Sequence, residues 1–356
     1  MANIVEAVKR NVHIIIMLLP ILSFIAPFLI LYSLHAWTFE QAYHGRTFLL
    51  FFLWLVVLEI ILSWEKLQRN KMSRLLSIRT VLFIMTLLLP TIYVVVANYY
   101  GLNAIITNLT SQYISQLQID ATQKLIIASQ MPISIEFLVF TVSLCLIISL
   151  AYGVNVLTDF SLSALFLGTF GLLFIMDHLY PGKLTPLQIF VPATATLAAN
   201  ALNLMGYKTS LSFATDMPLL IAIDPKTGKY FPAYINWTCA GVESLLIYTV
   251  TILLFLRKTT IPWKYRIIYF AIGATVTYFI NILRVATLFV IGVDKGGLSV
   301  EWQRFHNYYG MLYSVSWIVA YPLIIIGSQA LWGKIRNWKT SMKKTVNFST
   351  RTKLPE

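Results

Sequence analysis

The chain has 356 residues, of which 58% are hydrophobic and only 12% are charged, and its mean hydropathy is +0.74. A soluble domain carries about 25% charged residues, so the composition excludes an ordinary soluble protein and indicates a chain embedded in lipid. The net charge is +13, from 27 lysines and arginines against 14 aspartates and glutamates. In a membrane protein this excess first reports sidedness, so it does not by itself indicate nucleic acid. Two cysteines are too few for a disulfide framework.

Apolar runs close to the ~20 residues that a helix needs to cross a bilayer recur along the chain. We expect about eight membrane spans, near residues 13–33, 47–63, 81–98, 133–151, 160–179, 241–256, 267–291 and 308–331. A further stretch, residues 187–204, is less apolar and rich in alanine and threonine. The stretch 221–231 contains Asp-Pro-Lys-Thr-Gly, which is typical of a turn between two short extended segments.

Most of the basic residues lie in four clusters between or beside these runs. The clusters are Lys9 and Arg10; Lys66, Arg69, Lys71, Arg74 and Arg79; Arg257, Lys258, Lys264 and Arg266; and the tail with Lys334, Arg336, Lys339, Lys343, Lys344, Arg351 and Lys353. The positive-inside rule places all four in the cytoplasm, which puts both termini inside and requires an even number of spans. Residues 187–204 are therefore interpreted as a re-entrant or interfacial helix on the outer side. The outer segments are then residues 35–46, 101–132, 180–240 and 292–307.

Ionisable groups inside membrane spans are costly, and they are therefore candidates for function. Arg284 is the clearest, because it lies well inside the expected span 267–291. Asn281, three residues earlier, shares its helical face and is a supporting candidate. An arginine that only extends to the lipid headgroups is the alternative interpretation.

Cys239 lies at the outer mouth of the span that opens at Gly241. A thiol at a helix N-terminus near a cation such as Arg284 is favoured as thiolate and acts as a nucleophile. Glu243 lies four residues after Cys239 on the same face and is a supporting candidate. Cys145 lies in the middle of a span without polar neighbours in sequence, which is typical of an apolar filler.

His306 lies at the outer mouth of the last span, and Asn307 beside it is a further supporting candidate. A lone histidine among tyrosines is also typical of an interfacial anchor. Cys239, Arg284 and His306 nevertheless supply a nucleophile, a stabiliser of negative charge and a base on three successive spans. The cysteine–histidine pair follows the logic of papain-like enzymes, with an arginine where backbone amides usually hold the oxyanion.

At these residues the sequence resembles the exosortase/archaeosortase family of membrane-embedded cysteine transpeptidases. The resemblance rests on Cys239-Ala240-Gly241 at the start of a span, Arg284 in the next span and Phe305-His306 at the mouth of the last, in that order. It covers roughly residues 160–331. Bacterial members often carry serine where this chain has Ala240, and the Val-Glu-Ser continuation also departs from the pattern. These departures leave the subfamily open.

The resemblance implies an activity. Family members cleave C-terminal sorting signals of secreted surface proteins at the outer membrane face, through a thioester, and transfer the new C-terminus to a lipid or surface acceptor. Carried over, Cys239 attacks the scissile carbonyl, His306 moves the proton, and Arg284 either stabilises the oxyanion or holds the thiolate. The implied partners are membrane-anchored precursors with a motif, a transmembrane helix and a basic tail, together with a lipid acceptor in the cell membrane.

The chain is thus expected to contain an N-terminal transmembrane region (1–159), a catalytic transmembrane region (160–331) and a basic cytoplasmic tail (332–356). We expect no metal, cofactor or nucleic acid. A membrane glycosyltransferase is the first rival, but the first outer loop lacks an Asp-x-Asp pair for a metal or lipid phosphate. A transporter is the second rival, and it would need broken helices in two related halves, of which residues 187–204 supply only one candidate.

Overall fold

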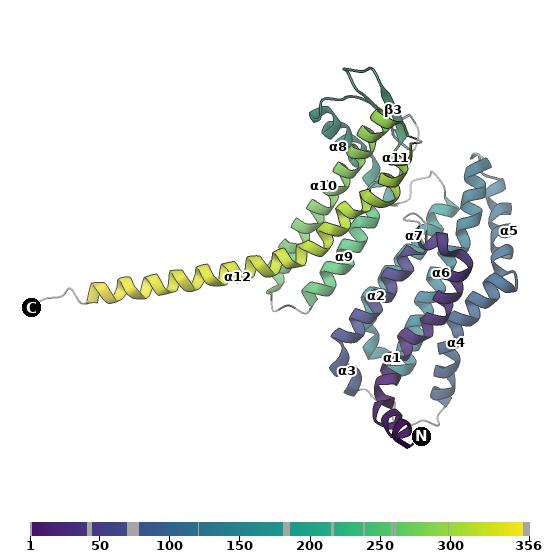
Figure 1. The fold of residues 1–356 in the computed structure, drawn as a ribbon, viewed down its shortest axis with the longest axis vertical. Coiled ribbons are helices and arrows are strands. Elements are labelled where there is room, and N and C mark those ends of the chain that lie inside the picture. Colours follow the sequence, from purple (N-terminus) through teal and green to yellow (C-terminus); the bar gives the residue numbers. More distant parts are fainter. Residues whose placement is uncertain are drawn as a thin grey trace, which may run out of the picture. The chain divides into compact units, whose positions relative to one another are not determined.

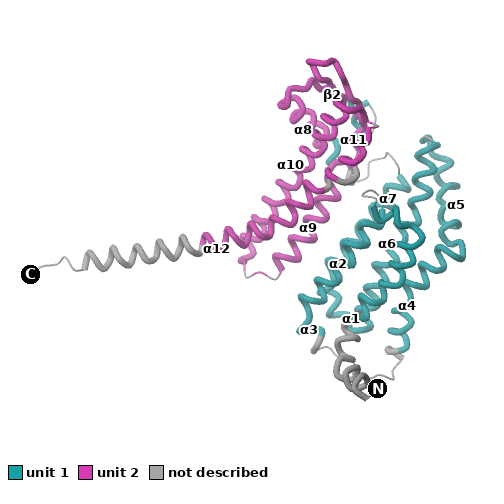
Figure 2. The backbone as a smooth tube through the Cα atoms, viewed as in Figure 1, with its two compact units in different colours: residues 1–192, 212–218 teal, residues 193–211, 219–356 magenta. Residues whose placement is uncertain are grey.

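The computed structural model describes residues 2–40, 45–69, 78–119, 121–180, 186–214, 217–237, 239–257, 259, 261–297 and 299–351. The described chain is mostly helical (Figure 1) and divides into two compact units (Figure 2). Unit 1 comprises residues 1–192 and 212–218, and unit 2 comprises residues 193–211 and 219–356. Four of the expected cytoplasmic basic residues lie outside the described residues, namely Lys71, Arg74, Lys258 and Lys353.

Unit 1 holds a series of helices and short helical turns. They are α1 (Ala2–His35), η1 (Ala36–Phe39), α2 (Thr47–Leu62), α3 (Trp64–Arg69), α4 (Ile78–Tyr99), α5 (Leu102–Ser115), α6 (Ala121–Tyr152), η2 (Val154–Phe160), α7 (Ser161–Leu179) and η3 (Pro186–Ile189). Helix α8 (Phe190–Leu204) begins in unit 1 and continues into unit 2. The remaining elements are β1 (Lys208–Ser212), β2 (Leu219–Ile223), β3 (Tyr230–Tyr234), α9 (Val242–Arg257), α10 (Trp263–Lys295), α11 (Val300–Arg304), the π-helical turn η4 (Phe305–Tyr309) and α12 (Gly310–Arg351).

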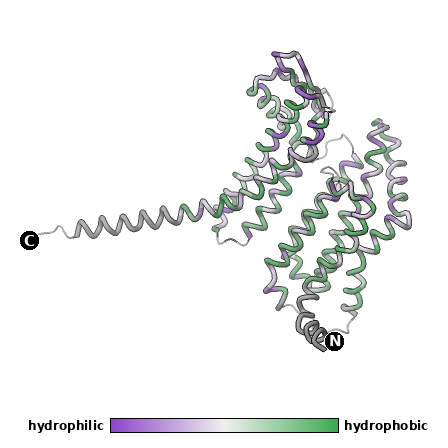
Figure 3. The backbone as a smooth tube through the Cα atoms, in the orientation of Figure 1, coloured by the Kyte–Doolittle hydropathy of each residue, from purple (hydrophilic) through white to green (hydrophobic). Residues whose placement is uncertain are grey.

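Six helical segments among the described residues are long and apolar enough to cross a membrane, and hydrophobic residues are concentrated along the helices (Figure 3). They are Leu18–Phe39, Val81–Tyr99, Ala121–Tyr152, Val154–Leu179, Trp263–Lys295 and Leu312–Trp332. These segments confirm a multi-pass membrane protein. The other two expected spans coincide with α2 and α9, each of 16 residues, which is short for a crossing. Eight spans and cytoplasmic termini therefore stay predictions.

The segment 101–132, expected as an outer loop, is largely helical. It contains α5 and the first turns of α6. Ile114 of α5 packs on Ile127 and Ala128 of α6, so the two segments bury a small apolar cluster of their own. This packing stabilises α5 as an amphipathic helix. Its polar residues lower the mean hydropathy of the segment, so a hydropathy profile does not detect it.

Phenylalanine side chains fill the core between α2, α6 and α7. Phe48 of α2 lies 4.2 Å, between ring centroids, from Phe170 of α7, and its ring also contacts Phe137 of α6 and Phe174 of α7. Gly171 has no room for a side chain, because a Cβ would lie 2.8 Å from a methyl of Leu138. This aromatic packing joins α7 to unit 1, although the sequence grouped residues 160–179 with the catalytic region.

The buried charges of unit 1 are matched. Arg46 donates two hydrogen bonds to the carboxylate of Glu136, at 2.8 and 2.9 Å, and a third to Thr38. Glu59 of α2 accepts hydrogen bonds from the backbone N–H groups of Leu162 and Ser163 at the start of α7. A carboxylate at a helix N-terminus satisfies donors that have no partner within the helix.

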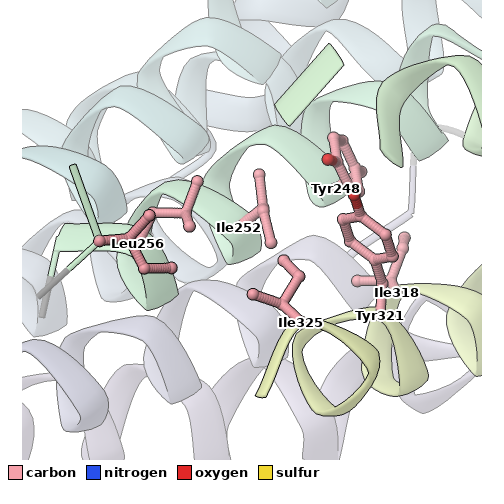
Figure 4. Close-up of a cluster of buried hydrophobic side chains, with 7 residues drawn as sticks. Tyr248, Ile252, Leu256, Ile318, Tyr321 and Ile325 are labelled. Atoms are coloured by element: carbon pink, nitrogen blue, oxygen red, sulfur yellow. The ribbon is translucent and has the colours of Figure 1, made fainter. Parts of the chain in front are cut away.

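Three helices of unit 2 are joined by buried tyrosines (Figure 4). Tyr248 of α9 and Tyr321 of α12 belong to one hydrophobic cluster with Ile252, Leu256, Ile261, Ile318 and Ile325. The Tyr248 hydroxyl donates to the Phe270 carbonyl of α10 at 2.9 Å, and Tyr321 donates to the Tyr269 carbonyl at 2.6 Å. Gly273 makes room, since a Cβ there would lie 2.1 Å from the Tyr248 oxygen. These contacts fix α9, α10 and α12 together.

A three-stranded sheet of order β1-β2-β3 completes unit 2. Strands β2 and β3 pair antiparallel, with Ala222 opposite Phe231 and Ile223 opposite Tyr230. This hairpin confirms the turn expected within residues 221–231. Asp224 accepts hydrogen bonds from the Thr227 hydroxyl and the Lys226 N–H, and these bonds lower the pKa of its carboxyl.

We predict that Glu59→Ala lowers the stability of the purified protein. The substitution leaves two buried backbone donors at the start of α7 without their acceptor, which costs roughly 2 kcal/mol of unfolding free energy. Thermal unfolding in detergent measures the effect. Glu65→Ala on the exposed surface of α3 is the control and should stay within about 0.5 kcal/mol of wild type. Equal destabilisation by both substitutions would contradict the capping role.

Candidate active site

Cys239 lies in a short turn between β3 and α9. Its N–H donates to the Asn236 carbonyl at 3.1 Å and lies 3.2 Å from the Asn236 side-chain oxygen. The Ala240 N–H donates to the carbonyl of Trp237, whose side chain is buried. Helix α9 begins three residues after Cys239. The turn therefore holds the cysteine just ahead of a helix N-terminus, where the sequence places it.

Asn281 of α10 anchors this turn. Its side-chain N–H donates to the Cys239 carbonyl at 2.8 Å, and the asparagine is fully buried. Gly241 permits the approach: it has a φ of +83°, and a Cβ there would lie 2.8 Å from the Asn281 amide. Thr194 of α8 hydrogen bonds to Tyr278 at 2.9 Å and also reaches the Ala240 carbonyl at 3.4 Å. Two helices thus satisfy consecutive carbonyls of the turn.

Arg284 lies one helical turn after Asn281 on α10. Its guanidinium donates to the His306 carbonyl at 3.4 Å. Gly310, the first residue of α12, packs against the same side chain, because a Cβ there would lie 2.8 Å from the Arg284 Nε. The arginine therefore contacts the backbone of the neighbouring segment that carries His306, within unit 2.

His306 lies in the π-helical turn η4, between α11 and α12. Turns of this kind are rare in proteins, and those that occur are often found at functional sites. The imidazole stacks on the Trp302 indole, with ring centroids 4.9 Å apart and planes 13° apart. The sequence did not single out Trp302. The signal available was its spacing of four residues from His306, which places both on one face of a helical segment.

The supporting candidates differ in what the structure describes of them. Glu243 lies in the first turn of α9, and its carboxylate is close enough to interact electrostatically with Arg284. Its Oε1 atom is buried and has no hydrogen-bond partner among the described residues. Asn281 holds the Cys239 turn, as described above. Asn307 follows His306 in η4, and its side chain lies outside the described part of the chain.

The remaining cysteine and two other histidines lie elsewhere. Cys145 is in α6 of unit 1. His35 hydrogen bonds to Asn98 at 3.0 Å, and His178 lies 3.3 Å from the Ser134 hydroxyl, both also in unit 1. Of the histidines whose side chains are described, His306 alone shares a unit with Cys239. The described residues contain no group of three or more histidine, cysteine or acidic side chains that could hold a metal ion.

Helix α10 is therefore the common support of the three candidates. Asn281 binds the segment that carries Cys239, and Arg284, one turn later, binds the segment that carries His306. The arrangement offers a thiol, an imidazole and a permanent cation within one compact unit. These groups are suited to nucleophilic attack on a carbonyl, with transfer of one proton and stabilisation of developing negative charge.

We predict that Gly241→Ala disrupts this support. The new Cβ meets the Asn281 amide in addition to a backbone conformation that costs alanine about 1–2 kcal/mol. Gly101→Ala is the matched control, since Gly101 also precedes a helix, has a φ of +81° and has open space around it. In a Cys145→Ala background, Gly241→Ala should change the rate of maleimide labelling of Cys239, whereas Gly101→Ala should not. Identical rates in both variants would show that the close contact does not matter.

Comparison with protein-family models matches the transmembrane exosortase family over residues 37–322. The matched range contains Cys239, Arg284 and His306, and it also includes most of unit 1. No curated protein and no solved structure matches the chain. Because the family model covers most of the chain, from η1 into the first third of α12, the protein belongs to the transmembrane exosortase family, as the resemblance at the cysteine, arginine and histidine segments predicted.

Proposed function

We propose that the protein is a cysteine transpeptidase that cleaves C-terminal sorting signals of secreted surface proteins. The observation that carries the proposal is the support of both the Cys239 turn and the His306 turn by residues one helical turn apart on α10. Family membership adds a general expectation of cysteine peptidase chemistry and sorting-signal processing. It gives no support to the rival classes, glycosyltransferase and transporter.

In the proposed acylation, the Cys239 sulfur attacks the carbonyl carbon of the scissile peptide bond while His306 accepts the thiol proton. The carbon–sulfur bond forms, and negative charge develops on the carbonyl oxygen. Collapse of this intermediate breaks the carbon–nitrogen bond, and the imidazolium gives its proton to the leaving amine. The N-terminal part of the substrate remains as a thioester on Cys239.

In the second step a hydroxyl or amine of a lipid or other surface acceptor attacks the thioester. The carbon–sulfur bond breaks, and the proton of the nucleophile passes through His306 back to the thiol. Arg284 carries a fixed fork of donors, which suits either an oxyanion in both steps or the thiolate before the first. Its hydrogen bond to the His306 carbonyl supports a place beside the reacting groups under either role.

The substrates under this proposal are precursors that end in a short motif, a transmembrane helix and a basic tail. With its basic clusters in the cytoplasm, the enzyme shares the orientation of such a precursor. Both then present their outer ends on the same side of the cell membrane. The acceptor is a lipid or another surface molecule.

We predict that Cys239→Ala abolishes C-terminal processing and anchoring of surface precursors in the native cells. The nucleophile is lost, and no other described cysteine lies in unit 2. Cys145→Ala is the matched control and should process precursors at the wild-type rate, because Cys145 lies in α6 of unit 1. Immunoblotting for unprocessed precursors measures both. Normal processing by Cys239→Ala would refute the mechanism.

We predict that Cys239 reacts with a membrane-impermeant maleimide added to the outside of intact cells. The Cys145→Ala variant leaves Cys239 as the single thiol of the chain. Right-side-out cells should label, and labelling of the double variant Cys145→Ala/Cys239→Ala gives the background. If Cys239 were labelled only when the reagent can reach the cytoplasmic face, the proposed orientation would be wrong.

A further inference from the structure

Trp302 lies between the His306 imidazole and the β2–β3 hairpin, a part of unit 2 that is far from His306 in the sequence. One face of the indole stacks on His306. The indole also meets the Phe231 ring of β3 edge-on, with centroids 6.0 Å apart and planes 60° apart. Its N–H is buried and has no hydrogen-bond partner among the described residues. Among the described residues no hydrogen bond orients the indole, so its contacts with aromatic neighbours hold it in position.

The Phe231 ring is itself held by close contacts with α10 and the residues that follow it. Its ring packs edge-on against Phe289 of α10, with centroids 5.4 Å apart. Two glycines make room for it: a Cβ at Gly292 would lie 2.5 Å from the ring, and one at Gly297 would lie 2.3 Å from it. The hairpin is also tied to the same end of α10 by Lys229, which reaches the Asp294 carbonyl at 3.5 Å. The β2–β3 hairpin thus presents Phe231 from a fixed position.

We propose that Trp302 is a positioning residue for His306, and that the β2–β3 hairpin holds Trp302 in place through Phe231. The structural part of this proposal stands on the ring contacts alone. Its consequence for catalysis rests on the proposed function, in which His306 transfers the proton of Cys239. The contacts form one series from the hairpin to the imidazole: Phe231, Trp302, His306.

An imidazole on a helical turn can rotate about two side-chain bonds, and only a narrow range of orientations serves proton transfer. A stacked indole fixes the plane of the ring and leaves both ring nitrogens at its edge available for hydrogen bonds. Displacement of a transferring group by about 1 Å can lower a rate roughly 100-fold. The stack is therefore expected to affect the rate of reaction even though Trp302 touches neither substrate nor thiol in this scheme.

The first arm of the test is spectroscopic and does not depend on activity. Full-length protein with ¹³C-labelled histidine rings is placed in lipid nanodiscs, and the His306 signal is assigned by its loss in His306→Gln. The indole ring current should displace this signal upfield in wild type, and Trp302→Ala should give the undisplaced value. Phe231→Ala should move the signal towards that value, because Trp302 loses the ring contact that holds it in place.

Tyr230→Ala is the matched control. Tyr230 is the neighbour of Phe231 on β3, and its side chain is exposed on the opposite face of the strand. It should leave the His306 signal at the wild-type position. Should Phe231→Ala fail to fold in a thermal unfolding assay, Phe231→Leu keeps most of the apolar volume and replaces it. A wild-type His306 signal in a folded Phe231 variant would overturn the role of the hairpin.

The second arm measures processing of surface precursors by pulse-chase in the native cells. Trp302→Ala should slow processing roughly 10- to 100-fold. Trp302→Phe retains a ring for stacking and also removes the unpaired N–H, so it should keep most of the wild-type rate. If Trp302→Phe were as slow as Trp302→Ala, ring stacking would not be the function of Trp302. If Cys239→Ala left processing unchanged, the proposed function would fail, while the nanodisc spectra would still decide whether His306 is positioned by this series.

Discussion

The hydrogen bond from Asn281 to the Cys239 carbonyl is the contact on which the candidate site depends. Near a bilayer, backbone groups outside helices need partners supplied by the protein. The Cys239 turn obtains these partners from side chains. Asn281 of α10 donates a hydrogen bond to the Cys239 carbonyl, and Thr194 of α8 donates one to the Ala240 carbonyl. Gly241 lets the two segments approach closely enough for this bond. A thiol can therefore be held outside a helix because a neighbouring helix satisfies the backbone that carries it.

Each unit contains buried polar groups that are paired and others without a described hydrogen-bond partner. In unit 1 the guanidinium of Arg46 meets both carboxylate oxygens of Glu136, and Glu59 caps a helix. These groups satisfy one another and serve packing. Buried atoms without a described hydrogen-bond partner occur in both units. Tyr93 Oη and Gln188 Oε1 are examples in unit 1, and beside the candidate site such atoms include Glu243 Oε1, Asn281 Oδ1 and Trp302 Nε1. Unpaired buried atoms cost free energy, so the site keeps an arrangement that is less stable than a fully paired core would be.

The sequence predicts those parts of the structure that depend on local pattern. Hydropathy locates the long spans, and the Asp-Pro-Lys-Thr-Gly stretch locates the hairpin turn. The helical character of residues 102–115 was missed, because its apolar residues are interrupted by polar ones and are stabilised by packing on α6. Asn281 was identified by its spacing from Arg284, but its bond to Cys239 joins segments far apart in the chain. The contact of Phe231 with Trp302 leaves no trace in either local sequence.

The length of α10 explains how one helix can serve both membrane and site. Its 33 residues extend about 50 Å, well beyond the ~30 Å of the hydrocarbon core. Arg284 lies on the order of 16 Å before the last residue, Lys295. The turns beyond Arg284 contact the β2–β3 hairpin: Gly292 packs against the Phe231 ring, and the Asp294 carbonyl accepts a hydrogen bond from Lys229. The last turns of α10 thus hold the hairpin beyond Arg284, and under the proposed function a precursor of like orientation meets the thiol near that end of the helix. Under the same proposal, the basic clusters set this orientation and so help to bring substrate and site to the same side of the membrane.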